Sequence, residues 1–357
     1  RDRTSGLTPP APMTTEKRGL PRALALLAFL GQASGVLVHR PHSRRRTNFA
    51  VAQGQGGQLL ATQGAGDLCD RTYYQPSRLE KQFYRHALAW TDNARPLCSR
   101  LGNFSKEWIA QNKAGGAAGS GFSRMCKKGK PAKAIEPLLG VLRDPRVLCN
   151  TSGTSGTAAD FAHSVEWLVL DDQPGRNTSQ DDSDSNNYLF DVGGGPFAKS
   201  LQFLVGAYEE RGIVFDHVFS WQPSLLSTDD YWAGVPGEVQ SFWEPRLTLY
   251  RNVSLTSSRR HAANNPMQHI QHHCRPTDFC SLKLDLHKPS LEQSLVQRML
   301  NATAGVGLVL DELFYDHRVH GIMQRHGWGK DVMGTFLDSY ITFTRLRELG
   351  IRAHPWI

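Results

Sequence analysis

Acidic and imidazole side chains recur directly after short apolar segments in the second half of this sequence. Asp191 ends one such segment, Asp285 and His287 follow a later one, and the next is surrounded by Asp311, Glu312, Asp316, His317 and His320. Carboxylates and imidazoles are common general acids, general bases and metal ligands, so both kinds of chemistry are open. A simpler interpretation also stays open, in which Asp191 caps a helix or turn and the others form structural ion pairs.

A glycine cluster follows Asp191 and separates an apolar segment from an amphipathic one. Gly193, Gly194 and Gly195 allow positive φ angles and a close approach of a ligand to the backbone. A helix that begins directly after them presents unpaired N–H groups to polar or anionic ligand atoms. This order is typical of nucleotide-binding sites. The predicted cofactor-binding residues are Asp191, Gly193, Gly194, Gly195, Trp221 and Gln222.

Alternating apolar and amphipathic segments from Tyr188 onward must position these residues. Strands are predicted at 189–192, 213–221, 247–253, 279–286, 306–314 and 351–357, and helices at 197–211, 291–300 and 334–349. The alternation predicts an α/β fold, a three-layer sandwich with a mostly parallel, Rossmann-like central sheet. Ligands of such sheets bind outside the carboxyl ends of the strands. The residues that follow each strand therefore form the candidate site.

Five segments of residues 188–357 carry a family resemblance when they are taken together. They are 189–195 (LFDVGGG), 212–221 (GIVFDHVFSW), 283–286 (KLDL), 309–314 (VLDELF) and 346–354 (LRELGIRAH). As an ordered set they resemble the FkbM-type methyltransferases, a branch of the class I S-adenosylmethionine-dependent enzymes. The chain looks similar to divergent members from algae and other unicellular eukaryotes, and the resemblance covers nearly half of its length.

The resemblance implies a Rossmann-like methyltransferase domain at residues 188–357, with S-adenosylmethionine as the cofactor. By this resemblance the loop from Asp191 to Gly195 holds the methionine and ribose portions, and Asp285 lies at the centre of the site. The implied reaction is methyl transfer to a hydroxyl of a small molecule, lipid or sugar, with Asp285 or His317 as the base. The family usually has an acidic residue where this chain has Gln222. That difference keeps a second hypothesis open: a non-catalytic or glycan-related lumenal protein that retains the scaffold.

The first 187 residues divide by composition into three parts. In residues 1–38, Lys17, Arg18 and Arg22 precede an apolar run at 23–38, a pattern typical of a secretory signal peptide or signal anchor. Residues 39–67 predict a disordered linker, and residues 68–187 predict a mainly helical or irregular region. We therefore expect a lumenal protein of the secretory pathway or one attached to a membrane through residues 23–38. A cytoplasmic or organellar protein with a transit leader is the alternative.

Sequons and cysteines agree with a secretory route. Asn-X-Ser/Thr acceptors occur at Asn103, Asn150, Asn177, Asn252 and Asn301. The six cysteines form an even set without a Cys-X-X-Cys pair, which excludes a zinc ribbon, and Cys274 and Cys280 are candidates to pair. Buried free thiols in a cytosolic protein are the alternative.

The net charge of +8 arises from 41 Lys and Arg against 33 Asp and Glu, and much of the excess lies at 39–46 and 124–133. Such runs are typical of solvated or membrane-flanking segments, and no nucleic-acid-binding motif accompanies them. We therefore expect no nucleic-acid partner, and the family resemblance implies a small-molecule or glycan acceptor. A metal-dependent hydrolase or glycosyltransferase using Asp285, Asp311, Glu312 and His317 is a third hypothesis. It lacks a paired acidic motif, and we assign no metal-binding residues.

Overall fold

The computed structural model describes residues 68–92, 121–140, 142, 144, 147, 164–171, 185–222, 227–257, 264–301, 309–321, 323–324 and 328–356. All of them belong to one compact unit, Ala61–Ile357. The predicted leader at 1–38 and linker at 39–67 lie outside these ranges. Among the helices in the described ranges, none has both the length and the apolar character needed to span a bilayer.

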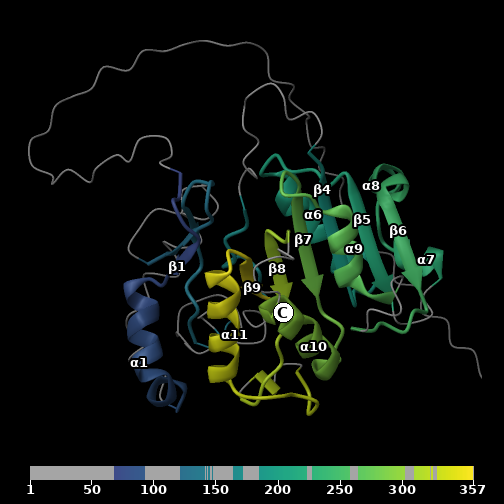
Figure 1. Ribbon diagram of the computed structural model, residues 1–357. Helices are drawn as coiled ribbons and strands as arrows, with labels where there is room; N and C mark the ends of the chain where they lie inside the picture. Colours follow the sequence, from purple (N-terminus) through teal and green to yellow (C-terminus); the bar gives the residue numbers. More distant parts are fainter. Residues whose placement is uncertain are drawn as a thin grey trace, which may run out of the picture. The chain divides into compact units, whose positions relative to one another are not determined.

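A parallel sheet of six described strands forms the centre of this unit (Figure 1). The strands are β4 (Asn187–Val192), β5 (His217–Gln222), β6 (Leu247–Arg251), β7 (Phe279–Leu284), β8 (Glu312–Tyr315) and β9 (Arg352–Pro355). They lie in the order β6-β5-β4-β7-β8-β9, and every neighbouring pair is parallel. The predicted α/β class with a mostly parallel central sheet is confirmed.

Helices cover both faces of the sheet. The hydrophobic cluster on one face includes residues of α9 (Pro266–His273), α10 (Pro289–Asn301) and α11 (Phe336–Glu348). The cluster on the other face includes residues of α5 (Phe197–Ser200), α6 (Gln202–Glu209), α7 (Thr228–Trp232) and α8 (Gly237–Trp243). Successive side chains of a strand point to opposite faces, so Phe190 joins the first cluster and Leu189 the second. In Figure 1, α9 lies in front of the sheet and α6 behind it.

The predicted element boundaries differ from the structure at two informative places. β5 begins at His217, although the apolar pattern starts at Ile213, because Ile213 and Phe215 are buried in the core without belonging to the strand. The segment between the strands predicted at 247–253 and 279–286, where no element was predicted, contains helix α9. Its start is fixed by Asn265, whose side chain accepts a hydrogen bond from the backbone N–H of Met267, and by a proline in the first turn.

The region before β4 contains a second sheet that the prediction of a mainly helical or irregular region missed. β1 (Tyr73–Gln75), β2 (Ser123–Cys126) and β3 (Lys133–Ile135) are antiparallel, and α1 (Arg78–Asp92) follows β1. A disulfide joins Cys69 to Cys126 at the end of β2. Lys133–Ile135 pairs with β2 as β3, in a region for which no strand was predicted. Strands of three or four residues contain too little alternation to be recognised in a sequence.

Buried charges join this region to the large sheet. Glu136, which directly follows β3, accepts hydrogen bonds from Arg347 of α11 at 2.6 Å and contacts His354 of β9 at 2.9 Å. The other ring nitrogen of His354 lies 2.7 Å from Glu312 of β8. Burial would raise the pKa of Glu136, but the charges of His354 and Arg347 outweigh it and lower that pKa. Loss of one member would leave a buried, uncompensated charge, so these residues have structural roles.

Candidate functional site

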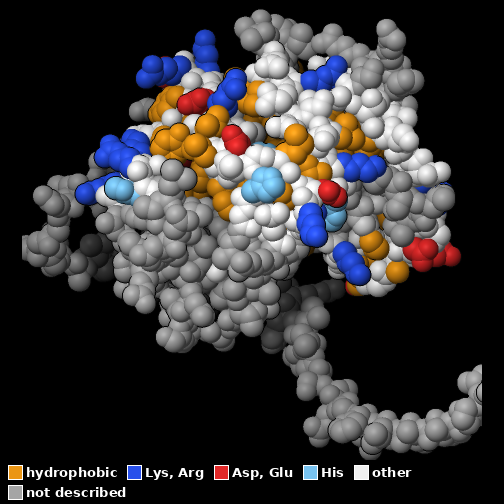
Figure 2. All heavy atoms as spheres, turned by 90° about the horizontal axis from the view of Figure 1, so that it is seen from below, with side chains coloured by type: hydrophobic (Ala, Val, Ile, Leu, Met, Phe, Trp, Pro, Cys, Tyr) orange, Lys and Arg blue, Asp and Glu red, His pale blue; other side chains and the backbone are white. Residues whose placement is uncertain are grey.

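The order of the strands locates the candidate site. From β4 the chain first adds β5 and β6 on one side and later β7, β8 and β9 on the other, so the order reverses between β4 and β7. In open parallel sheets, ligands bind at such a reversal, outside the carboxyl ends of the strands. Figure 2 views the molecule from below Figure 1, the side toward which the strand arrows point. Histidine, acidic and basic side chains lie there among hydrophobic ones.

The glycine loop lies against the residue that follows β7. Gly193 has a φ of +99° and its N–H donates to the carbonyl oxygen of Trp221 at 3.2 Å. A Cβ built on Gly193 would lie 2.5 Å from Cα of Leu286 and would clash more severely with the carbonyl oxygen of Asp285. No atom of the described residues lies within 4 Å of a Cβ built on Gly195. The loop is therefore tight where it meets β7 and open at its third glycine.

Asp191 lies beneath this loop and is fully buried. Its carboxylate accepts hydrogen bonds from Ser220 Oγ at 2.8 Å and from Lys283 Nζ at 3.1 Å, and Lys283 also donates to Ser200 Oγ at 3.0 Å. Burial would lower the pKa of Lys283, but the negative charges of Asp191 and Asp285 outweigh it and raise that pKa. Asp191 therefore belongs to a buried polar network with Ser220 and Lys283, and α5 begins without a side-chain cap, so the predicted cap by Asp191 is not formed. Its contact with a cofactor stays a prediction.

The two residues at the end of β5 are also enclosed. Trp221 is fully buried, and its ring stacks on those of Tyr250 and Phe190, with centroids 4.9 and 6.5 Å away. Gln222 is fully buried as well, and its Nε2 donates to Ser220 Oγ at 3.0 Å. Neither side chain faces the solvent, so the predicted cofactor contacts of both stay predictions. The carbonyl oxygen of Trp221 shapes the site directly because it holds the N–H of Gly193.

Asp285 is the predicted catalytic residue that lies at the strand end. Its side chain is 15% exposed, with one oxygen 3.0 Å from Nε2 of His287 and the other 3.6 Å from Nζ of Lys283. Burial would raise the pKa of Asp285, but the hydrogen bond from His287 and the charge of Lys283 outweigh it and lower that pKa. The same hydrogen bond raises the pKa of His287. This pair therefore places a carboxylate and an imidazole within reach of solvent at the end of β7.

Two further carboxyl groups lie beside this pair. Asp316 follows β8 and accepts hydrogen bonds from Arg318 Nε at 2.7 Å and Trp328 Nε1 at 3.1 Å. Glu292 of α10 accepts one from the backbone N–H of Leu286 at 2.5 Å. Burial, and then the charge of Asp316, raises the pKa of Glu292 to about 7. The sequence analysis missed Glu292, because a glutamate in the first turns of an amphipathic helix gives no signal of a site.

His317, the other predicted base, is buried and faces a different neighbour. Its Nδ1 lies 2.8 Å from Ser339 Oγ in α11, and its ring stacks on Tyr315 with a centroid distance of 4.9 Å. These contacts join the end of β8 to α11. A catalytic role for His317 stays a prediction, since its described contacts are with structural elements.

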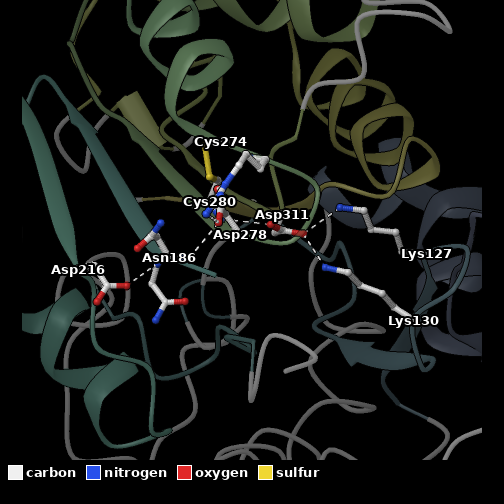
Figure 3. The surroundings of a disulfide bond; sticks show 10 residues. Lys127, Lys130, Asn186, Asp216, Cys274, Asp278, Cys280 and Asp311 are labelled. Carbon is white, nitrogen blue, oxygen red and sulfur yellow. Dashed lines mark hydrogen bonds and ion pairs between the residues drawn. A yellow bond between two sulfur atoms is a disulfide. The ribbon is translucent and has the colours of Figure 1, made fainter. Parts of the chain in front are cut away.

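Asp311 and Glu312 lie at the amino ends of the strands, opposite to Asp285, because β8 begins at Glu312. Asp311 binds Lys127 Nζ at 2.8 Å and Lys130 Nζ at 3.1 Å, close to the disulfide between Cys274 and Cys280 (Figure 3). Glu312 belongs to the buried network with His354. The expectation that these acids could converge with Asp285 is wrong, since they lie at the start of β8, whereas Asp316 follows its end. The suggested pairing of Cys274 with Cys280 is confirmed.

No family model, curated protein or solved structure matches this chain. Evidence for the function therefore comes from the residues and the geometry described above.

Proposed function

We propose that this protein is an S-adenosylmethionine-dependent O-methyltransferase that acts on a hydroxyl of a small molecule, lipid or sugar. One observation carries the proposal: the positive-φ turn at Gly193 packs on the backbone of Asp285 where the strand order reverses. Backbone groups of a cofactor loop and a partly exposed carboxylate thereby lie side by side. The methyltransferase class of the fold, suggested by the resemblance of residues 188–357, is part of this proposal.

Methyl transfer requires alignment more than covalent help from the protein. The enzyme must hold the acceptor oxygen in line with the methyl group and receive its proton. The open space at Gly195 suits the cofactor, whose polar atoms would meet the N–H groups around the start of α5. Asp285 and His287 are the candidates for the proton transfer, because both side chains reach solvent beside the loop.

A non-catalytic or glycan-related lumenal protein is the second candidate, and a specific observation favours it. Asp191 and Gln222 are completely buried, and each is bonded to Ser220, so neither side chain is exposed to a ligand in solution. A scaffold that has lost its cofactor would keep such contacts because they stabilise the sheet. In that case the space at Gly195 has no ligand.

Calorimetric titration of the purified full-length chain separates the two candidates. S-adenosylmethionine and its demethylated product should bind in the range of about 1 μM to 1 mM, typical of enzyme ligands, whereas NAD⁺ should not bind. A Gly195→Leu variant should fold normally and lose binding, because the side chain fills open space at the loop. Gly237→Leu is the matched control, since a Cβ there also meets no described atom and the residue lies in α8. Absence of binding to the wild type contradicts the methyltransferase proposal.

The proposal includes the lumen of the secretory pathway, or a membrane attachment through residues 23–38, as the location. The disulfides Cys69–Cys126 and Cys274–Cys280 support it, because such bonds persist in oxidising compartments. The sequon at Asn252 is exposed directly after β6, where a glycan would meet solvent. A mobility shift of native material after endoglycosidase treatment tests this location, and an unchanged mobility contradicts it.

A further inference from the structure

Three potential metal ligands converge at the carboxyl ends of β7 and β8. Asp285, His287 and Asp316 each offer one ligand atom, and these atoms all lie within 4.8 Å of one another. The parallel register brings this about: Leu284 pairs with Tyr315, so the residues that follow the two strands are neighbours. His287 has a positive φ of +55°, the backbone conformation in which its ring meets Asp285.

A third carboxyl group gives independent evidence of a ligand. Glu292 is 1% exposed, and its Oε1 accepts the N–H of Leu286, the residue between Asp285 and His287. Its Oε2 is buried and has no hydrogen-bond partner among the residues that the structure describes. Glu292 is near enough to Asp316 and Asp285 for their charges to act on its carboxyl. A buried oxygen without a partner costs about 1–3 kcal/mol, and a bound cation would remove that cost.

We infer that Asp285, His287 and Asp316 form a binding site for one divalent transition-metal ion such as Mn²⁺, with Glu292 beside it. Carboxylate oxygens together with one imidazole nitrogen suit Mn²⁺ better than Ca²⁺, which prefers oxygen ligands only. The hydrogen bonds that Asp316 accepts from Arg318 and Trp328 orient its carboxylate oxygens.

The charges around the site set its expected affinity. Lys283 lies 3.6 Å from Asp285, and Arg318 lies 2.7 Å from Asp316, so two cations offset part of the negative charge. We therefore expect moderate affinity, with a Kd of about 10⁻⁵ to 10⁻³ M, as in the weaker carboxylate sites of proteins. A cation there could also bind the acceptor hydroxyl and lower its pKa; this last role rests on the proposed methyltransferase function.

The test is a titration of the EDTA-treated, dialysed full-length chain with MnCl₂, without S-adenosylmethionine, followed by the electron paramagnetic resonance signal of free Mn²⁺. The wild type should bind one equivalent. His287→Gly should weaken binding at least tenfold and leave the fold intact, because His287 is exposed and glycine accepts its positive φ. Glu292→Gln, which keeps an oxygen for the N–H of Leu286, should weaken binding several-fold. His272→Ala, at an exposed histidine of α9, is the control and should bind as the wild type does.

Absence of a stoichiometric site in the wild type overturns the inference, as does a site that His287→Gly leaves unchanged. The methyltransferase proposal is tested separately, because the calorimetric titration of S-adenosylmethionine is performed in EDTA. Mn²⁺ binding without cofactor binding would support the metal site and contradict the methyltransferase. Cofactor binding without Mn²⁺ binding would do the reverse.

Discussion

Alanine substitutions at Gly193, Gly194 and Gly195 test how closely each residue of the loop packs on its neighbours. In Gly193→Ala, the new Cβ would lie 2.5 Å from Cα of Leu286 and clash with the carbonyl oxygen of Asp285. Both are backbone atoms, so neither can rotate away. The left-handed conformation costs about 1–2 kcal/mol for a residue with a Cβ, and overpacking costs about 1–3 kcal/mol more. We expect Gly193→Ala to lower the free energy of unfolding by about 2–5 kcal/mol.

The two neighbouring glycines provide graded comparisons. A Cβ on Gly194 would lie 2.5 Å from Oδ2 of Asp191, and it would also clash with Oγ of Ser200. These are side-chain atoms that can shift, but only by weakening their bonds to Lys283, so we expect a loss of about 1–3 kcal/mol. A Cβ on Gly195 meets no described atom within 4 Å, so Gly195→Ala should change stability by at most about 0.5 kcal/mol.

Urea unfolding followed by tryptophan fluorescence measures the series, because Trp221 lies under the loop and is fully buried. Domains are typically stable by only about 5–15 kcal/mol, so a loss of 2–5 kcal/mol moves the midpoint clearly. We expect Gly195→Ala to be the most stable of the three variants, Gly194→Ala to be intermediate and Gly193→Ala to be the least stable. If Gly193→Ala unfolds at the same urea concentration as Gly195→Ala, the loop does not pack on Asp285, and the basis of the proposed cofactor site is lost.

Three further predictions concern the charges and cross-links around the sheet. Lys283→Met leaves buried Asp191 without its cation, so it should lower the free energy of unfolding in urea by about 3–5 kcal/mol. The double variant Lys283→Met/Asp191→Leu should recover at least half of that loss. A single variant as stable as the wild type contradicts this prediction. Burial, and then the charge of a neighbouring aspartate, raises the pKa of Glu292 from 4.5 to about 7. The stability that this group contributes is complete below pH 4.5 and is lost as the pH rises through about 7. Over this pH range, in EDTA, the free energy of unfolding of the wild type should fall by about 3 kcal/mol relative to that of Glu292→Gln. A difference between the two proteins that does not change with pH would refute the assignment. Cys69→Ala/Cys126→Ala should lower the free energy of unfolding by about 4 kcal/mol, because the disulfide closes a loop with a sequence separation of 57. A double variant that unfolds at the same temperature as the wild type would exclude this contribution.

Much of the sheet could be predicted because its strands and helices carry strong local patterns. The strand at Leu189 is buried on both faces, as a central parallel strand must be, and Thr335 together with Asp338 forms the capping box that starts α11. The short strands β1 to β3 gave no such pattern. They form because distant segments pair, as when Tyr73 meets Cys126, and single-sequence periodicity does not report such pairing.

The sequence predicted which residues lie near the ends of the strands, but not which of their side chains are buried and which reach solvent. That Asp285 and Asp316 end neighbouring strands follows from the α/β pattern, once the strand order is known. Which carboxylates turn inward does not follow from it. Asp191 and Asp285 are both acids at or after the end of a strand, yet Asp191 is fully buried beside Lys283, whereas Asp285 reaches solvent beside His287.

The sequence by itself determined the parallel sheet, the glycine loop after its first strand and the acidic residues around its strands, because local apolar periodicity and glycine conformational freedom are properties of short segments. Tertiary structure alone decided which of these residues share one edge. It moved Asp311 and Glu312 to the amino edge by starting β8 at Glu312, and it brought Glu292 to Asp285 and Asp316. The physical reason is that strand register and helix docking are set by contacts between segments far apart in the chain, which no local pattern encodes.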